Sequence, residues 1–167
     1  MPKVCEFVVY GIAQPKGSTR PWIKVLRDKE TGERKTIVRT TSANLKLKPW
    51  EDDIRAAIQN AAPGIFFEKD AAVSLRIVFW MPRPKSLVKR ILHHLTAPDL
   101  SKLVRGAEDA LTGKLWADDS QVVHVNAWKL YTTEQPRAEY RIVEIDQPIT
   151  AHVIEQIEAD QNFSLPW

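Results

Sequence analysis

The chain has 167 residues, of which 44% are hydrophobic and 27% are charged, and its formal net charge is +3. These values predict one globular domain with its own core and exclude a globally disordered chain. No apolar run reaches the roughly 20 residues of a membrane helix, and the start of the chain lacks the apolar core of a signal peptide. The lone Cys5 excludes an internal disulfide. We therefore expect a cytoplasmic protein in which Cys5 is a small buried residue.

Positive charge is concentrated in two segments. Residues 16–48 carry ten Lys and Arg against three acids, and residues 83–105 carry six against one. Residues 144–162 have five acids and no Lys or Arg. Basic segments of this kind indicate a polyanionic partner, in particular nucleic acid. An unevenly charged, solvated surface is the alternative.

The predicted elements begin with a strand at residues 6–12 and a basic, turn-rich loop at 13–22. Residues 23–26 and 36–39 predict the two strands of a hairpin, because a polar segment containing a Gly separates them. Apolar residues at helical spacing predict a helix over 47–62, and the Pro-Gly pair that follows ends it.

The strongest predicted strand lies at residues 72–81, where the apolar density favours a central position in a sheet. An irregular basic loop follows at 83–97, although part of it also has helical spacing. Residues 122–131 and 138–145 predict an antiparallel pair of strands, and residues 150–157 predict a terminal helix.

Helices interspersed with strands favour an α+β fold, in which a mixed sheet packs against helices. We expect residues 1–167 to form a single domain, with 147–167 as a C-terminal extension. The tryptophans at core-compatible positions are Trp50, Trp80, Trp116 and Trp128. The four histidines lack zinc-ligand spacing, and His93 and His94 are candidates to touch DNA.

Residues 98–123, with the sequence PDLSKLVRGAEDALTGKLWADDSQVV, carry most of the information about function. They predict an amphipathic helix with Asp99 at its N-cap and a Gly at its end. Asp118 and Asp119 follow, just before a strand. Clustered carboxylates repel one another, so a fold that gathers them usually holds a cation, and we predict a magnesium site that acts on phosphate. A simple helix cap and a solvated turn are the alternatives.

The predicted helix has an apolar face for packing on the sheet, formed by Leu103, Ala107, Ala110 and Leu111. Its polar face carries Arg105, whose guanidinium is suited to neutralising a scissile phosphate.

This segment resembles the RusA family of Holliday-junction resolvases, especially its phage-encoded branch. The family pattern is close to P-D-L-D-N-L-x-K-x-x-x-D-A-L-T-x-x-x-x-x-D-D-x-Q-V-V. The segments GIAQPKGSTRPW and LKLKPWEDDIRAAI also resemble the N-terminal portions of phage members. The resemblance implies a homodimer with a mixed α/β fold. It also implies that the protein binds four-way DNA junctions and nicks two opposed strands with Mg²⁺ or Mn²⁺.

The resemblance also assigns roles to individual residues. Asp99 and Asp119 match the essential acids and Asp118 matches the neighbour of the second acid, which implies that Asp99 and Asp119 bind the metal with the assistance of Asp118. Arg105 stands where the family usually has a functional Lys, which keeps the positive charge and changes its geometry. Ser101 replaces the second acid of the family's D-L-D, and a hydroxyl is a poor ligand for a hard cation compared with a carboxylate.

Glu108 is the candidate to replace this missing carboxylate, because it shares a helix face with Ser101. The two positions are about 10 Å apart along the helix. A Glu side chain that points back toward the helix N-terminus recovers part of that distance. The alternative is a surface Glu paired with Arg105 or Thr112.

Basic residues in both segments are candidates to contact the DNA backbone, namely Lys16, Arg20, Lys24, Arg27, Lys85, Lys89, Arg90 and Lys102. Two other functions remain open. The loss of an acid at Ser101 favours a junction-binding protein with impaired cleavage, which the absence of metal-dependent nicking would identify. The second alternative is a magnesium nuclease that acts on flaps or branched intermediates, and substrate competition would identify it.

Overall fold

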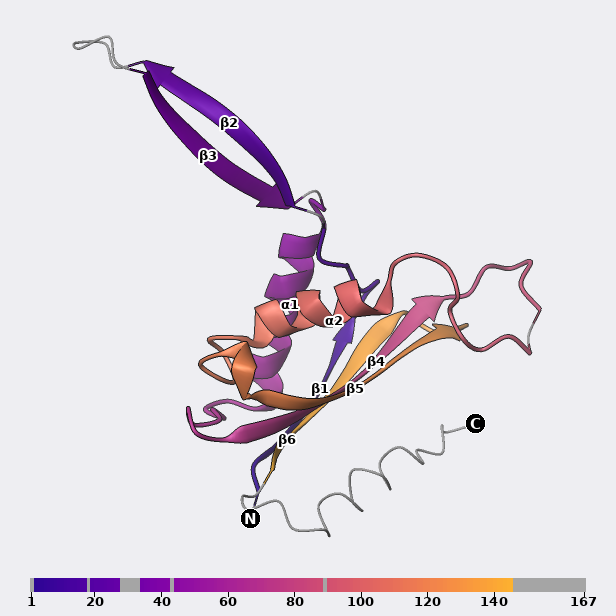
Figure 1. Cartoon of the computed structure of the whole chain (residues 1–167). Coiled ribbons are helices and arrows are strands. Elements are labelled where there is room, and N and C mark those ends of the chain that lie inside the picture. The colour runs from indigo at the N-terminus through magenta and orange to yellow at the C-terminus, as the bar shows by residue number, and fades with distance from the viewer. Residues whose placement is uncertain (1, 18, 28–33, 43, 89, 146–167) are drawn as a thin grey trace.

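The computed structural model describes residues 2–17, 19–27, 34–42, 44–88 and 90–145. Its elements in chain order are β1 (Val4–Tyr10), β2 (Thr19–Arg27), β3 (Arg34–Ser42), α1 (Leu47–Ala61), β4 (Ala72–Pro82), α2 (Leu100–Leu111), the short 3-10 helix η1 (Asp119–Gln121), β5 (Val122–Thr132) and β6 (Arg137–Ile145). Figure 1 shows a body made of the two helices and a four-stranded sheet, and a hairpin of β2 and β3 that projects from it. The fold is a single α+β domain, as the sequence predicts.

The four-stranded sheet has the order β1-β6-β4-β5 and is mixed, since β4 and β5 are parallel and the other neighbours are antiparallel. The predicted direct pairing of residues 122–131 with 138–145 is therefore wrong, because β4 lies between them. The apolar β4 takes the central position that its sequence favours. Skipping one strand spans about 10 Å, which the four-residue connection between β5 and β6 can bridge.

The core lies between this sheet and the two helices. From β4, the alternate residues Val73, Leu75, Ile77 and Phe79 are fully buried. From α2, the predicted apolar face is buried as expected, through Leu103, Ala107, Ala110 and Leu111. Cys5 is buried in the same core, which confirms its predicted position.

Several boundaries differ from the sequence predictions. Strand β2 begins at Thr19, so it includes the end of the predicted loop at residues 13–22. Pro21 is tolerated because a two-stranded hairpin has only edge strands. The predicted loop at 83–97 contains no helix in its described part, and Arg83 binds the carbonyls of Val88 and Ile91 at 3.1 and 2.6 Å. The predicted terminal helix and extension lie outside the described residues.

The tryptophans divide between core and surface. Trp50 and Trp116 are buried, as predicted. Trp128 is 36% exposed, so its predicted core position is wrong. It lies on β5, which is the last strand of the sheet and has a neighbouring strand on one side only. None of the helices in the described part of the chain has the length and apolar character needed to span a membrane.

The root of the hairpin is attached to α2 by a contact that we call the arm clamp, formed by Gln14, Lys16, Asn44 and Gly106. The Lys16 N–H donates to the Lys102 carbonyl at 2.8 Å, and Asn44 donates to the Pro15 carbonyl at 3.0 Å. A Cβ at Gly106 would lie 3.2 Å from the Gln14 oxygen and 3.3 Å from the Lys16 nitrogen. The missing side chain therefore lets the chain at the hairpin root lie directly against α2.

We expect Gly106→Val to lower the free energy of unfolding by about 1–3 kcal/mol, because the added methyl groups must push the backbone of the arm clamp away from α2. Urea unfolding monitored by circular dichroism measures this change. Ala56→Val, at an exposed position of α1, controls for a β-branched residue in a helix. Equal stability of Gly106→Val and the wild type would show that the clamp contact is not tight.

Candidate active site along helix α2

Asp99 lies at the N-cap of α2, as predicted, but its side chain makes no capping hydrogen bond. Its carboxylate is exposed and forms an ion pair with Lys102 at 2.8 Å. This hydrogen bond and the charge of Lys102, with a smaller contribution from Lys129, hold the pKa of Asp99 below its usual value. Asp99 is therefore ionised at neutral pH, with its charge directed to a neighbouring cation rather than to the helix backbone.

Asp118 and Asp119 lie beyond the other end of α2. The Asp118 Oδ1 accepts the Ser120 N–H at 2.9 Å, and the Gln121 side chain accepts the N–H groups of Ala117 and Asp118. Hydrogen bonds from Ser120 lower the pKa of Asp118. The predicted turn is thus present, and it caps η1 while leaving the Asp119 side chain exposed.

Glu108 lies near the C-terminal end of α2 and is half-buried. Burial raises its pKa, and the nearby charges of Asp119 and then Asp109 raise it further, while Arg105 opposes them. The charge of Asp119 thus reaches Glu108 and disfavours its ionised form. This is the carboxylate repulsion that a bound cation would relieve.

Asp99 does not join this pair within one chain. Helix α2 has 12 residues and is about 18 Å long, with Asp99 at one end and Asp118 and Asp119 beyond the other (Figure 1). Among the described residues, no three or more His, Cys, Asp and Glu side chains are grouped closely enough to hold a metal ion. Within one chain the charge of Asp119 acts on Glu108, whereas Asp99 lies at the N-terminal end of α2.

Glu108 and Asp119 nevertheless suit Mg²⁺. This ion prefers oxygen ligands, keeps several of its waters, and is often held by one or two carboxylates together with substrate phosphates. Ser101 is exposed in the first, N-terminal turn of α2, directly after Asp99 and at the opposite end of the helix from Glu108. In this chain, Glu108 is therefore placed to support the Asp119 end rather than the Ser101 end.

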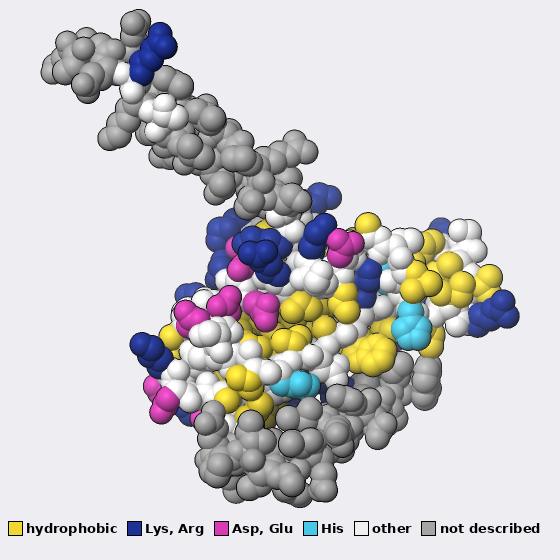
Figure 2. Space-filling view, viewed as in Figure 1, with side chains coloured by type: hydrophobic (Ala, Val, Ile, Leu, Met, Phe, Trp, Pro, Cys, Tyr) yellow, Lys and Arg dark blue, Asp and Glu magenta, His cyan; other side chains and the backbone are white. Residues whose placement is uncertain are grey.

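Two predicted DNA-binding cations form ion pairs with acids on or next to α2. Lys16 pairs with Asp109, and Lys102 pairs with Asp99. Exposed side chains belong to Arg105, Lys85 and Arg90. The remaining candidates occupy β2 or lie outside the described residues, namely Arg20, Lys24, Arg27 and Lys89. Figure 2 shows Lys and Arg side chains gathered beside the hairpin root, close to acidic side chains on the body.

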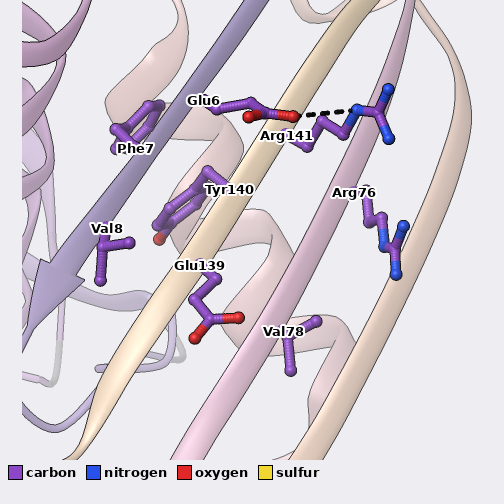
Figure 3. A pocket seen from close by; sticks show the side chains of 8 residues that line it. All are labelled: Glu6, Phe7, Val8, Arg76, Val78, Glu139, Tyr140 and Arg141. Atoms are coloured by element: carbon purple, nitrogen blue, oxygen red, sulfur yellow. Dashed lines mark ion pairs between the residues drawn. The ribbon is translucent and has the colours of Figure 1, made fainter. Parts of the chain in front are cut away.

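A pocket of about 340 Å³ lies on the sheet face opposite the helices, lined by Glu6, Phe7, Val8, Arg76, Val78, Glu139, Tyr140 and Arg141 (Figure 3). Arg141 pairs with Glu6 at 3.2 Å across it. None of the predicted site residues lines this pocket, so we do not include it in the candidate site.

Two residues at the site stand outside the predicted set. Gly106 belongs to the arm clamp. It could have been noticed in the sequence as a Gly inside a predicted helix. A Gly there lowers helix stability by about 1 kcal/mol relative to Ala and usually has a packing reason. Lys129 binds the loop that precedes Asp99. The sequence feature that could have identified Lys129 is a charged residue placed among the apolar residues of a strand.

The family model described as Endodeoxyribonuclease RusA matches residues 13–143, which is most of the chain. The chain therefore belongs to the RusA endodeoxyribonuclease family, and the resemblance found in the sequence is confirmed. A relative from Bacillus subtilis (strain 168), the uncharacterized protein YqaN, is 36% identical over 83 residues. That match covers 44% of this chain and 58% of the relative, so the two proteins are similar over only part of their lengths.

We expect Glu108→Gln to stabilise the protein at pH 7 in the absence of metal. Because the pKa of Glu108 is raised in the fold, its ionisation lowers stability as the pH rises above the ordinary Glu range. The difference should vanish below about pH 4, where Glu is protonated in both states. Thermal unfolding across this range measures the effect, and the exposed Glu68→Gln is the control.

Addition of Mg²⁺ should make the wild type more stable than Glu108→Gln, because the ion would stabilise the ionised wild type more than the variant. A wild type that is at least as stable as Glu108→Gln at pH 7 without metal would contradict the prediction.

Proposed function

We propose that this protein is a magnesium-dependent endodeoxyribonuclease that cuts four-way DNA junctions, with Mn²⁺ as a substitute ion. The observation that carries the proposal is the RusA family match over residues 13–143, and it is supported by the charge of Asp119 acting on the half-buried Glu108 of α2. Two neighbouring carboxylates on a basic chain suit a hard cation and a phosphate substrate.

In this proposal Asp119 and Glu108 hold the ion, and Asp118 fixes the turn that carries Asp119. A bound Mg²⁺ supplies Lewis-acid activation of water and neutralises charge on the phosphate. Arg105, exposed on α2 and close enough to lower the pKa of Glu108, stabilises the negative charge that develops as water attacks phosphorus. The P–O bond to the leaving strand then breaks.

Asp99 enters the site from a second copy of the chain. Within one chain it is the N-cap of a helix about 18 Å long, whereas Asp119 follows the other end of that helix. A two-fold dimer that sets the α2 helices antiparallel would bring the Asp99 end of each copy to the Asp118–Asp119 end of the other. This arrangement completes two equivalent sites, which suits a substrate that is itself close to two-fold symmetric.

The hairpin and the loop at residues 83–97 are the proposed DNA contacts. Arg20, Lys24 and Arg27 lie along β2, and the arm clamp fixes the root of this hairpin to the catalytic helix. Contacts of this kind bind phosphates and position the duplex without reading its sequence. A cytoplasmic location and a phage or prophage origin remain predictions.

The proposal is tested by incubating a labelled four-way junction with the protein and Mg²⁺, beside linear duplex, a flap substrate and the Asp119→Asn variant. We expect paired nicks in the junction that require metal and are lost in the variant. Tight junction binding without nicks, in Mg²⁺ or Mn²⁺, would support a junction-binding protein instead. Preferential cutting of the flap in competition would support a nuclease of branched intermediates.

We expect Lys102→Asn to lower the Mg²⁺ concentration for half-maximal cleavage by about two- to fivefold. The Lys102 ammonium pairs with Asp99 and must leave before a metal binds there, and an exposed ion pair contributes up to about 1 kcal/mol. Magnesium titration of the cleavage rate at saturating junction measures the change.

The matched control is Lys48→Asn, because Lys48 forms an exposed ion pair with Asp52 at the same 2.8 Å. Junction binding is also measured for both variants without metal. This measurement distinguishes a loss of DNA affinity from a change in the magnesium requirement. An unchanged or raised magnesium requirement in Lys102→Asn alone would show that Lys102 does not compete with the metal.

A further inference from the structure

Lys129 of β5 lies on the face of the sheet that packs against the core, which is an unusual position for a charged residue. It pairs with Phe79 of β4, which is fully buried on the sheet face that the helices cover. Neighbours in a sheet point to the same face, so Lys129 lies on this face as well. An ammonium group placed beside a core requires polar partners to offset its loss of water.

The partners of the Lys129 ammonium are two backbone carbonyls in the loop before α2. The Nζ atom donates to the Thr96 oxygen at 2.7 Å and to the Pro98 oxygen at 2.6 Å. Both bonds are short, as expected when the donor carries a charge. The side chain thus ties the last residues of the loop to the edge strand of the sheet.

The backbone around Lys129 holds the same loop. The His94 N–H donates to the Lys129 carbonyl at 3.0 Å, and the Tyr131 N–H donates to the Leu92 carbonyl at 2.7 Å. These backbone bonds fix the middle of the loop, and the Lys129 side chain fixes its end. The attachment therefore extends to Pro98, the residue directly before Asp99.

Asp99 depends on this attachment because its own side chain makes no capping bond to α2. The Lys102 ion pair that it does make is exposed, and exposed pairs of long side chains contribute little to holding a geometry. The direction of the Asp99 carboxylate is set by the backbone on either side of it, which is α2 after it and the Pro98 peptide before it.

We propose that Lys129 is a positioning residue, which aims Asp99 by binding the carbonyls of Thr96 and Pro98 and does not itself touch the DNA. This inference rests on the proposed function, since it gives Asp99 a role in cleavage. The metal ligand and its support therefore come from α2 and from the strand beneath it.

The test compares Lys129→Met, which keeps the aliphatic stem and removes the donors, with Lys129→Arg, which keeps charged donors. Lys114→Met, at an exposed position beyond α2, is the matched control. The measurements are the single-turnover cleavage rate at saturating junction, the junction dissociation constant without metal, and hydrogen–deuterium exchange of residues 92–98.

We expect Lys129→Met to cut about 10- to 100-fold more slowly, as is typical when support for a metal ligand is removed. Its junction affinity should stay within about twofold of the wild type, because no phosphate contact is lost. Exchange in residues 92–98 should accelerate about tenfold, and Lys129→Arg should recover most of both losses. The Lys114→Met control should match the wild type in all three measurements.

A normal cleavage rate in Lys129→Met, or a loss confined to junction affinity, would overturn the proposal. If the wild type itself cuts no junction, the proposed function fails. Hydrogen exchange then tests separately whether Lys129 holds residues 92–98 in place. Unchanged exchange at residues 92–98 in Lys129→Met would overturn it, whatever the activity of the wild type.

Discussion

The packing of α2 on the sheet is the constraint on which the candidate site depends. The helix buries Leu103, Ala107, Ala110 and Leu111 completely, and such close-packed contacts leave it no freedom to slide or tilt. Helix α2 is about 18 Å long, and Asp99 is its N-cap while Asp118 and Asp119 follow its other end. Because Asp99 is the N-cap of α2 and Asp119 follows its other end, we propose a site that two copies complete.

One acid near each end of α2, Asp99 and Asp109, pairs with a lysine of the same chain. Lys102 pairs with Asp99, and Lys16 pairs with Asp109 while its backbone joins the hairpin root to the helix. The Lys102–Asp99 pair is exposed, and exposed pairs are weak and can exchange partners when a metal or a phosphate arrives. The arm clamp and the Lys129 contacts are different, because they act through the backbone and set the position of α2 relative to the hairpin and the loop at 83–97.

The features of the fold that follow from local periodicity could be predicted from the sequence. Helix α2 and its buried face follow from apolar residues at helical spacing, and the central place of β4 follows from its apolar density. Strand neighbours depend instead on contacts between distant segments, so the short connection at residues 133–136 wrongly suggested that β5 and β6 are paired. The candidate acids could be named from their positions at a helix N-cap and before a strand and from the family resemblance, but the distance between Asp99 and Asp119 depends on how α2 lies over β5.

The most direct test of this account uses a heterodimer of the Asp99→Asn and Asp119→Asn variants, coexpressed with two different tags and purified through both. If the site is completed between copies, one site of this heterodimer contains both mutations and the other contains neither. The account predicts that it makes single nicks in a four-way junction at about half the wild-type rate per dimer, while each variant alone is inactive. A heterodimer as inactive as either homodimer would contradict the account and place both acids in one chain's own site.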